Sequence, residues 1–117
     1  MRLEILLIAA DPGARDFVLR YLGRHWVTVA ASPEEAALLL SARRYGFVLT
    51  TNFGIPAEDA IAVVPAERDY PVLFLTGHVT DRIEKECVEK SVPSLRVPEA
   101  LNVLPGMLRL ALEDLRI

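Results

Sequence analysis

Few side chains in this chain could do acid–base chemistry from the positions where such chemistry is usually placed. General acid–base catalysis needs a positioned histidine, carboxylate or lysine, and the residues just after the predicted strands offer Asp11 and His78. Asp11 stands directly before Pro12, a pattern in which the aspartate caps a helix. His78 has no orienting partner close in the sequence. We therefore predict no catalytic residue and no enzymatic activity.

Cofactor and metal signatures are also missing from the sequence. It has no dinucleotide-binding glycine pattern, no phosphate-binding loop that ends in Gly-Lys-Ser/Thr, and no cluster of histidine and cysteine. A hard divalent cation needs two or more converging carboxylates, whereas the first predicted strand ends in Ala9 and Ala10. We expect neither a metal ion nor a cofactor.

The bulk composition suggests one globular domain over residues 1–117. Hydrophobic residues make up 52% of the chain, and the net charge of −3 argues against a nucleic-acid-binding protein, which should carry a basic face. The single cysteine, Cys87, has no partner for an internal disulfide, which suits a reducing compartment. The sequence shows neither a signal peptide pattern nor an apolar run long enough to span a membrane, so we expect a cytoplasmic location.

Strand and helix signals alternate along the whole chain. An uninterrupted apolar run such as residues 3–8 is typical of a strand that is buried on both faces of a parallel sheet. The predicted strands span residues 3–8, 26–31, 46–51, 71–76 and 93–97. The predicted helices begin near Pro12, Pro33, Pro56, Thr80 and Leu104, and the last of them ends near Arg116. This alternation predicts a three-layer, doubly wound α/β domain with a parallel five-stranded sheet.

Four segments together resemble a response-regulator receiver domain of the chemotaxis-regulator (CheY-like) type. They are "ILLIAADP", "YGFVLTTNFGIP", "PVLFLTGH" and "SLRVPEAL", and their order and spacing cover essentially the whole chain. The resemblance implies a flavodoxin-like receiver fold with strand order 2-1-3-4-5. It also implies a role in two-component signal transduction, in which a phosphorelay delivers a phosphoryl group to the receiver.

The residues that carry this chemistry in the resembled family are largely absent here. The family's magnesium-binding acidic pair falls on Ala9 and Ala10, and its phosphoacceptor aspartate falls on Thr51 or Asn52. The family's lysine falls on Val97. The switch threonine is retained as Thr76. The resemblance therefore implies a degenerate pseudo-receiver that lacks the phosphoacceptor aspartate.

The last predicted helix offers a candidate interaction surface. Its apolar arc is wider than one core contact needs, and we predict that Met107, Leu110 and Ile117 contact a protein partner of unknown identity or a second copy of the chain. The leading interpretation is a stand-alone signalling domain that acts by phosphorylation-independent protein–protein interaction, without nucleic acid or membrane.

Two other functions remain open from the sequence. A small-molecule-binding sensor or enzyme could reuse the pocket at the carboxyl ends of the strands. Its predicted lining is Ala9, Ala10, Thr51, Asn52, Thr76 and His78. Alternatively, the chain is an atypical receiver that is modified on Thr50 or Thr51.

Overall fold

The computed structural model confirms the predicted alternation of strands and helices, and it describes residues 2–23, 25–78, 80–97 and 99–115. The strands are β1 (Glu4–Ile8), β2 (Trp26–Ala30), β3 (Phe47–Thr51), β4 (Val72–Thr76) and β5 (Ser94–Arg96). The helices are α1 (Pro12–Leu22), α2 (Pro33–Ala42), α3 (Ala57–Ala62), α4 (Asp81–Glu89) and α5 (Glu99–Leu115).

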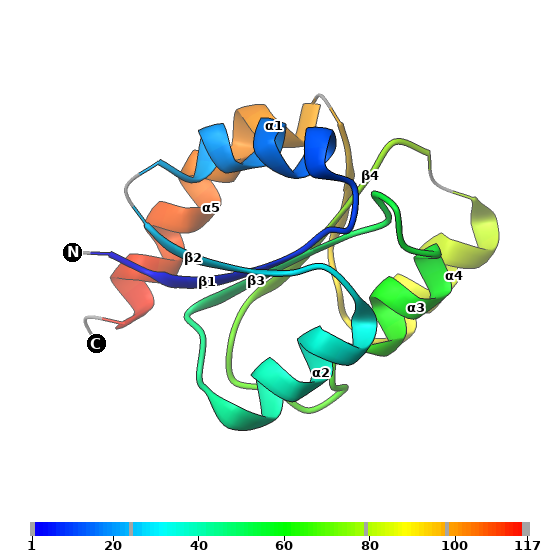
Figure 1. Cartoon of the computed structure of the whole chain (residues 1–117), viewed down its shortest axis with the longest axis horizontal. Coiled ribbons are helices and arrows are strands. Elements are labelled where there is room, and N and C mark those ends of the chain that lie inside the picture. The colour runs from blue at the N-terminus through cyan, green and yellow to red at the C-terminus, as the bar shows by residue number, and fades with distance from the viewer. Residues whose placement is uncertain (1, 24, 79, 98, 116–117) are drawn as a thin grey trace.

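The five strands form one parallel sheet in the predicted order β2-β1-β3-β4-β5. Helices α1 and α5 cover one face of the sheet, and α2, α3 and α4 cover the other (Figure 1). The predicted three-layer architecture is therefore confirmed. None of the helices in the described ranges is both long enough and apolar enough to cross a membrane.

Strand β1 supplies side chains to two separate cores. Ile5 and Leu7 belong to the core under α1 and α5, whereas Leu6 and Ile8 belong to the core under α2, α3 and α4. All four side chains are fully buried, because alternate residues of a strand point to opposite faces of the sheet. Each such burial contributes about 1.5–3 kcal/mol, so this one strand ties both helical layers to the sheet.

Three helices begin with a capping side chain, and the one at Asp11 is the cap that the sequence predicts. The side chains of Asp11, Ser32 and Thr80 each accept a hydrogen bond from a backbone N–H in the first helical turn, at 2.9, 3.1 and 3.2 Å. Each of these bonds satisfies a donor that the helix itself leaves without a partner.

The predicted start of the last helix is wrong. Helix α5 begins at Glu99 rather than at Leu104, and Pro105 lies inside it. A proline is favoured in the first helical turn and costs an internal hydrogen bond elsewhere, which is why the sequence pattern suggested a start at this point. Ala100 and Leu101 are buried in the core under α1 and α5, and the burial of this extra turn offsets the lost bond.

The lysine that follows α4 caps the C-terminal end of α3. The Nζ atom of Lys90, just after α4, donates hydrogen bonds at 2.8–3.2 Å to the carbonyl oxygens of Ile61, Ala62 and Val64. The carbonyl groups at a helix C-terminus lack partners within the helix and carry partial negative charge. In turn, Arg68 donates to the Lys90 carbonyl oxygen at 3.0 Å. These bonds fasten α3 and α4 to each other at the end of the molecule where both helices stop.

The buried thiol of Cys87 fits a structural role. It is a free cysteine on α4 in the core under α2, α3 and α4. Burial raises the pKa of the Cys87 thiol, which disfavours the reactive thiolate.

We expect the stability of the fold to fall between neutral and mildly acidic pH through His25. The backbone N–H of Leu3 donates a hydrogen bond of 2.9 Å to Nδ1 of His25, which must be unprotonated to accept it. Burial lowers the pKa of His25 below its ordinary value of 6.5, and the positive charge of Arg2 lowers it further. The unfolded chain therefore binds the proton more tightly. This stabilisation is complete above about pH 6.5 and is lost as the pH falls toward the lower pKa of the folded protein.

Denaturant unfolding at a series of pH values measures this effect, with His25→Asn as the control. The asparagine side chain offers an acceptor oxygen close to the position of Nδ1 and does not titrate in this range. We expect the free energy of unfolding of the wild type to decrease from pH 7 to pH 5.5 more steeply than that of His25→Asn. Parallel pH profiles would show that His25 has no such role.

Candidate functional site

The carboxyl ends of the central strands meet at one edge of the sheet, where ligands bind in open parallel sheets (Figure 1). Ile8 of β1 pairs with Thr50 of β3, so Ala9 lies level with Thr51. Thr51 pairs with Leu75 of β4, which is followed directly by Thr76. The structure therefore brings the predicted positions of β1, β3 and β4 together at one edge.

Among the described residues, no acidic cluster stands at this edge. Ala9 is buried in the core under α1 and α5, and Ala10 is half-buried. The Asp11 side chain is committed to capping α1 through its Oδ2 atom. Within the described ranges, no group of three or more histidine, cysteine, aspartate or glutamate side chains converges in a way that could hold a metal ion.

The threonine hydroxyls near this edge are buried and are used within the fold. Thr50, Thr51 and Thr76 are each 0% exposed. Their Oγ1 atoms donate hydrogen bonds of 2.7–2.8 Å to the carbonyl oxygens of Ala60, Ile8 and His78. A buried hydroxyl needs such a partner, so each hydroxyl has a structural reason to be there, and none is accessible to a modifying enzyme in this conformation.

The loop after β3 closes directly onto the loop after β1. The carbonyl oxygen of Phe53 accepts hydrogen bonds from the backbone N–H groups of Ala10 and Asp11, at 2.9 and 3.0 Å. Gly54 has a φ of 80°, and a Cβ atom on it would lie only 2.8 Å from the Asp11 nitrogen. The two loops are thus in contact through their backbones. No chemical motif marks Gly54 in the sequence; its position in the short loop between a strand and Pro56 is the signal that could have identified it.

Asn52 is the one residue in this loop with an unused polar atom. Its side chain is half-buried, and its Oδ1 atom is buried without a hydrogen-bond partner among the described residues. One unsatisfied amide gives too few contacts to define a ligand.

At β5 the predicted lysine position carries an apolar side chain. Val97 is half-buried against the core under α1 and α5, and its N–H donates to the Thr76 carbonyl oxygen at 3.0 Å. The exposed His78 is held to Thr76 only through its backbone atoms. Because Val97 occupies the position of the family's lysine, that position contributes no positive charge to this edge of the sheet.

The candidate interaction residues of α5 divide into two kinds. Met107 is half-buried and packs against the core under α1 and α5, whereas Leu110 is 62% exposed. Ile117 lies outside the described residues. Part of the wide apolar arc is thus explained by the core. Val103, which was not among the predicted interaction residues, is 48% exposed and lies seven residues before Leu110 on the same side of the helix.

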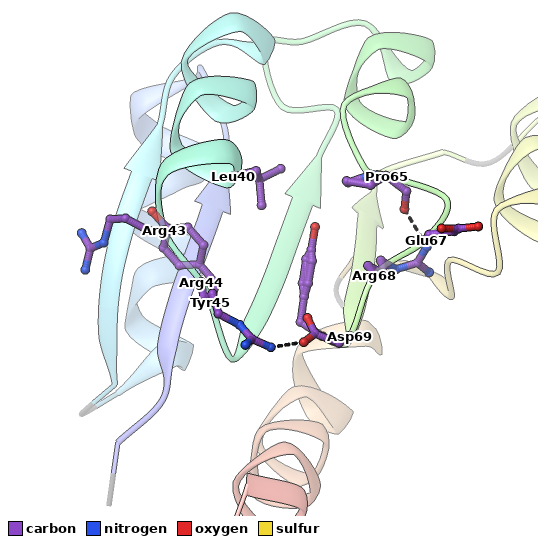
Figure 2. Close-up of a pocket in the computed structure, with 9 residues that line it drawn as sticks. Leu40, Arg43, Arg44, Tyr45, Pro65, Glu67, Arg68 and Asp69 are labelled. Carbon is purple, nitrogen blue, oxygen red and sulfur yellow. Dashed lines mark hydrogen bonds and ion pairs between the residues drawn. The ribbon is translucent and has the colours of Figure 1, made fainter.

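A cavity of about 220 Å³ lies at the opposite edge of the sheet, beside the amino ends of β3 and β4. Figure 2 shows Arg44 and Asp69 joined by an ion pair across this cavity, with Leu40 and Pro65 also in its lining. Arg68 points toward the Pro65 carbonyl oxygen and donates to it at 3.0 Å. The guanidinium groups of Arg44 and Arg68 are thus bonded to protein atoms, and the cavity is far from the carboxyl ends of the strands where the sequence predicted a pocket.

Comparison with known proteins identifies the fold but not a family. No protein-family model matches the chain, and no curated protein matches it. Among solved structures, it is similar to the signal receiver domain of an HD domain-containing protein from Pseudomonas fluorescens, with a TM-score of 0.78, 21% identity and 97% of each chain covered. It is also similar to the receiver domain of a signal transduction histidine kinase from Syntrophus aciditrophicus, with a TM-score of 0.79, 21% identity, and coverage of 96% of this chain and 91% of that one.

The chain has the receiver-domain fold. A third similar structure is the receiver domain of a sensor histidine kinase from Pseudomonas aeruginosa, which holds a magnesium ion in its active-site cleft. Its TM-score is 0.75 and its identity 20%, with 93% of this chain and 96% of that one covered. These similarities confirm the predicted sheet order and architecture of this receiver fold.

The corresponding edge of this receiver fold does not suit a magnesium ion. Such an ion is usually held through carboxylates in octahedral geometry, and the positions after β1 carry Ala9 and Ala10. The Phe53 carbonyl oxygen, which could otherwise contribute a ligand, accepts two backbone hydrogen bonds. We therefore derive no chemistry through magnesium at this edge.

We expect Gly54→Ala to destabilise the fold by about 1–3 kcal/mol, because a side chain there is both strained and in collision with the loop after β1. Gly23→Ala is the matched control, since Gly23 also has a positive φ, of 58°, but none of the described residues lies within 4 Å of a Cβ atom there. Denaturant unfolding should show the larger loss for Gly54→Ala. Equal losses would mean that the collision with the loop after β1 adds nothing to the cost of the strained backbone.

Proposed function

We propose that this chain is a response-regulator-like signalling domain of the pseudo-receiver kind, which acts through protein–protein contact without phosphoryl transfer. The observation that carries the proposal is the contact between the loops after β1 and β3, at the carboxyl ends of the strands. There the loop of Phe53 and Gly54 is bonded to the backbone that follows β1, and two alanines occupy the positions of the family's acidic pair. A cytoplasmic location is part of this proposal.

Phosphoryl transfer depends on positioned charge that this edge does not provide. Catalysis of this reaction consists mainly of orienting the nucleophile and stabilising the charge on the transferred group. We infer that Thr51 is equivalent to the phosphoacceptor, because the strand register places it beside Ala9. Its hydroxyl is buried and donates to the Ile8 carbonyl oxygen at 2.7 Å, and Val97 supplies no cation.

The same contacts weigh against the other two interpretations. Modification of Thr50 or Thr51 would require an enzyme to reach hydroxyls that are 0% exposed. A sensor or enzyme would need space at the carboxyl ends of the strands, where the loop after β3 instead rests on the loop after β1. Interaction through an outer surface needs neither an accessible threonine hydroxyl nor a pocket at the carboxyl ends of the strands.

The outer side of α5 is the surface we assign to a protein partner. Val103 and Leu110 are exposed there, and Met107 lies between them with part of its side chain in the core. Isolated exposed apolar residues are common on monomers, but a row of three along one helix is suited to a helix or groove of a partner. The partner's identity stays outside this proposal.

We expect no phosphoprotein after incubation with acetyl phosphate and magnesium. Intact-mass spectrometry should show the unmodified chain, and the fluorescence of Trp26, the only tryptophan, should not respond to magnesium. A receiver domain that retains its aspartate and acidic pair serves as the positive control for the assay. A stoichiometric phosphoryl adduct, localised by peptide mapping, would overturn the proposal.

We expect Leu110→Glu to reduce recovery of the partner by about tenfold or more, because a charge replaces an apolar contact. The measurement is affinity purification from the source organism with quantitative mass spectrometry. Leu38→Glu is the matched control, since Leu38 is a similarly exposed leucine on α2, across the sheet from α5. A partner that Leu110→Glu recovers as well as the wild type does would contradict the assignment to α5.

A further inference from the structure

The two edge strands of the sheet, β2 and β5, differ in how their unpaired sides are protected. Edge strands expose unpaired backbone groups, and proteins protect them with short length, charges or prolines. Strand β5 has three residues, includes Arg96 and follows Pro93. Strand β2 has five residues, "WVTVA", with no charge, proline or glycine, and in the described structure it pairs only with β1.

The free side of β2 carries a defined set of donors and acceptors. The Trp26 N–H donates to the Leu3 carbonyl oxygen, and the Ala30 carbonyl oxygen accepts from the Ala9 N–H, both at 3.0 Å. Because such bonds alternate along a strand, Val27 and Val29 direct their N–H and C=O groups away from β1. Backbone groups of this kind need a partner or water.

Apolar side chains flank this edge on the α2 face of the sheet. Trp26 is 53% exposed, and Leu38 on α2 is 71% exposed. Helix α2 packs on both β2 and β1, so it lies close to the free edge. Neither side chain is required by the core, and the predicted function of α5 does not use them.

We propose that β2 pairs antiparallel with β2 of a second copy of this chain, about a two-fold axis through Thr28. The two five-stranded sheets then form one continuous ten-stranded sheet. Val27 of each copy pairs with Val29 of the other, which satisfies the outward backbone groups of both strands. Thr28 lies opposite Thr28, a favourable cross-strand pair, and the large Trp26 side chain lies opposite the small Ala30.

The charges of α2 favour a second copy as the occupant of this edge. The first turn of α2 carries Glu34 and Glu35, and Arg43 follows its last residue. Arg43 forms an ion pair of 3.3 Å with Glu4 of β1, but half of its side chain stays exposed to a second copy. The two-fold axis places the two α2 helices antiparallel, so the acidic start of each lies near the basic end of the other. Strands are about 4.8 Å apart, so helices centred between β1 and β2 in each copy are separated by about 10 Å, the usual distance for packed helices. Leu38 of each copy then lies near the axis.

Sedimentation velocity over a range of concentrations tests this dimer. We expect the wild type to reach twice the monomer mass in the micromolar range. Leu38→Glu and Trp26→Glu should each raise the dissociation constant by about tenfold or more, because like charges then meet at the interface. The new carboxylates at position 38 face each other across the axis, and the one at position 26 lies near the acidic first turn of the other copy's α2. Both side chains are exposed, so the fold should be retained, as circular dichroism and thermal unfolding can verify. Leu110→Glu is the matched control and should dimerise as the wild type does.

Hydrogen exchange tests the strand pairing itself. The amides of Val27 and Val29 should be protected in the wild-type dimer and exchange fast in Leu38→Glu. The amide of Thr28, which faces β1, should be protected in both proteins. Fast exchange at Val27 and Val29 in a wild-type dimer would overturn the pairing.

Two sedimentation results would also overturn the proposal. One is a wild type that stays monomeric at high micromolar concentration. The other is a dimer that Leu110→Glu dissociates and Leu38→Glu does not, which would move the interface to α5. Neither result bears on the phosphorylation test, so this dimer and the proposed function can fail separately.

Discussion

The burial of β1 on both faces is the constraint on which the rest of this structure depends. A strand with large apolar side chains on both sides is stable only between two layers that exclude water, and parallel strands joined by crossover helices provide these layers. Ile5 and Leu7 define one core, and Leu6 and Ile8 define the other. With β1 second in the sheet, the carboxyl ends of β1, β3 and β4 are brought to a common edge, so the same constraint fixes where a site would be.

At that edge, the polar groups form hydrogen bonds within the protein, at positions where the resembled receiver family has charged side chains. The hydroxyls of Thr51 and Thr76 donate hydrogen bonds to nearby carbonyl oxygens, and the Phe53 carbonyl oxygen accepts two hydrogen bonds from backbone N–H groups of the loop after β1. Carboxylates close together would repel one another without a cation between them, whereas these neutral hydrogen bonds need no bound ion. The scaffold thus keeps its shape at this edge without a ligand. This is consistent with a domain that signals through its outer surface.

Two outer surfaces differ in what they could contact. The row of Val103, Met107 and Leu110 on α5 offers side chains alone. The β2 edge offers backbone donors and acceptors as well, in an arrangement that a two-fold axis makes self-complementary. A side-chain surface can fit many partners, while an unpaired strand edge selects another strand. The two surfaces could therefore serve a dimer and a separate partner at the same time.

The sequence alone determined the features that depend on local pattern. The buried strands and the helix cap at Asp11 could be read from neighbouring residues. The strand order, and the identification of Ala9 and Ala10 as the positions of missing acids, depended on the resemblance to the receiver family. Local pattern failed at Pro105, because the stability of the first turns of α5 comes from packing against the sheet. It also could not show that Gly54 touches the loop after β1 or that Met107 is half-buried while Leu110 is exposed. Those features depend on which residues distant in sequence become neighbours, and only the tertiary structure decides that.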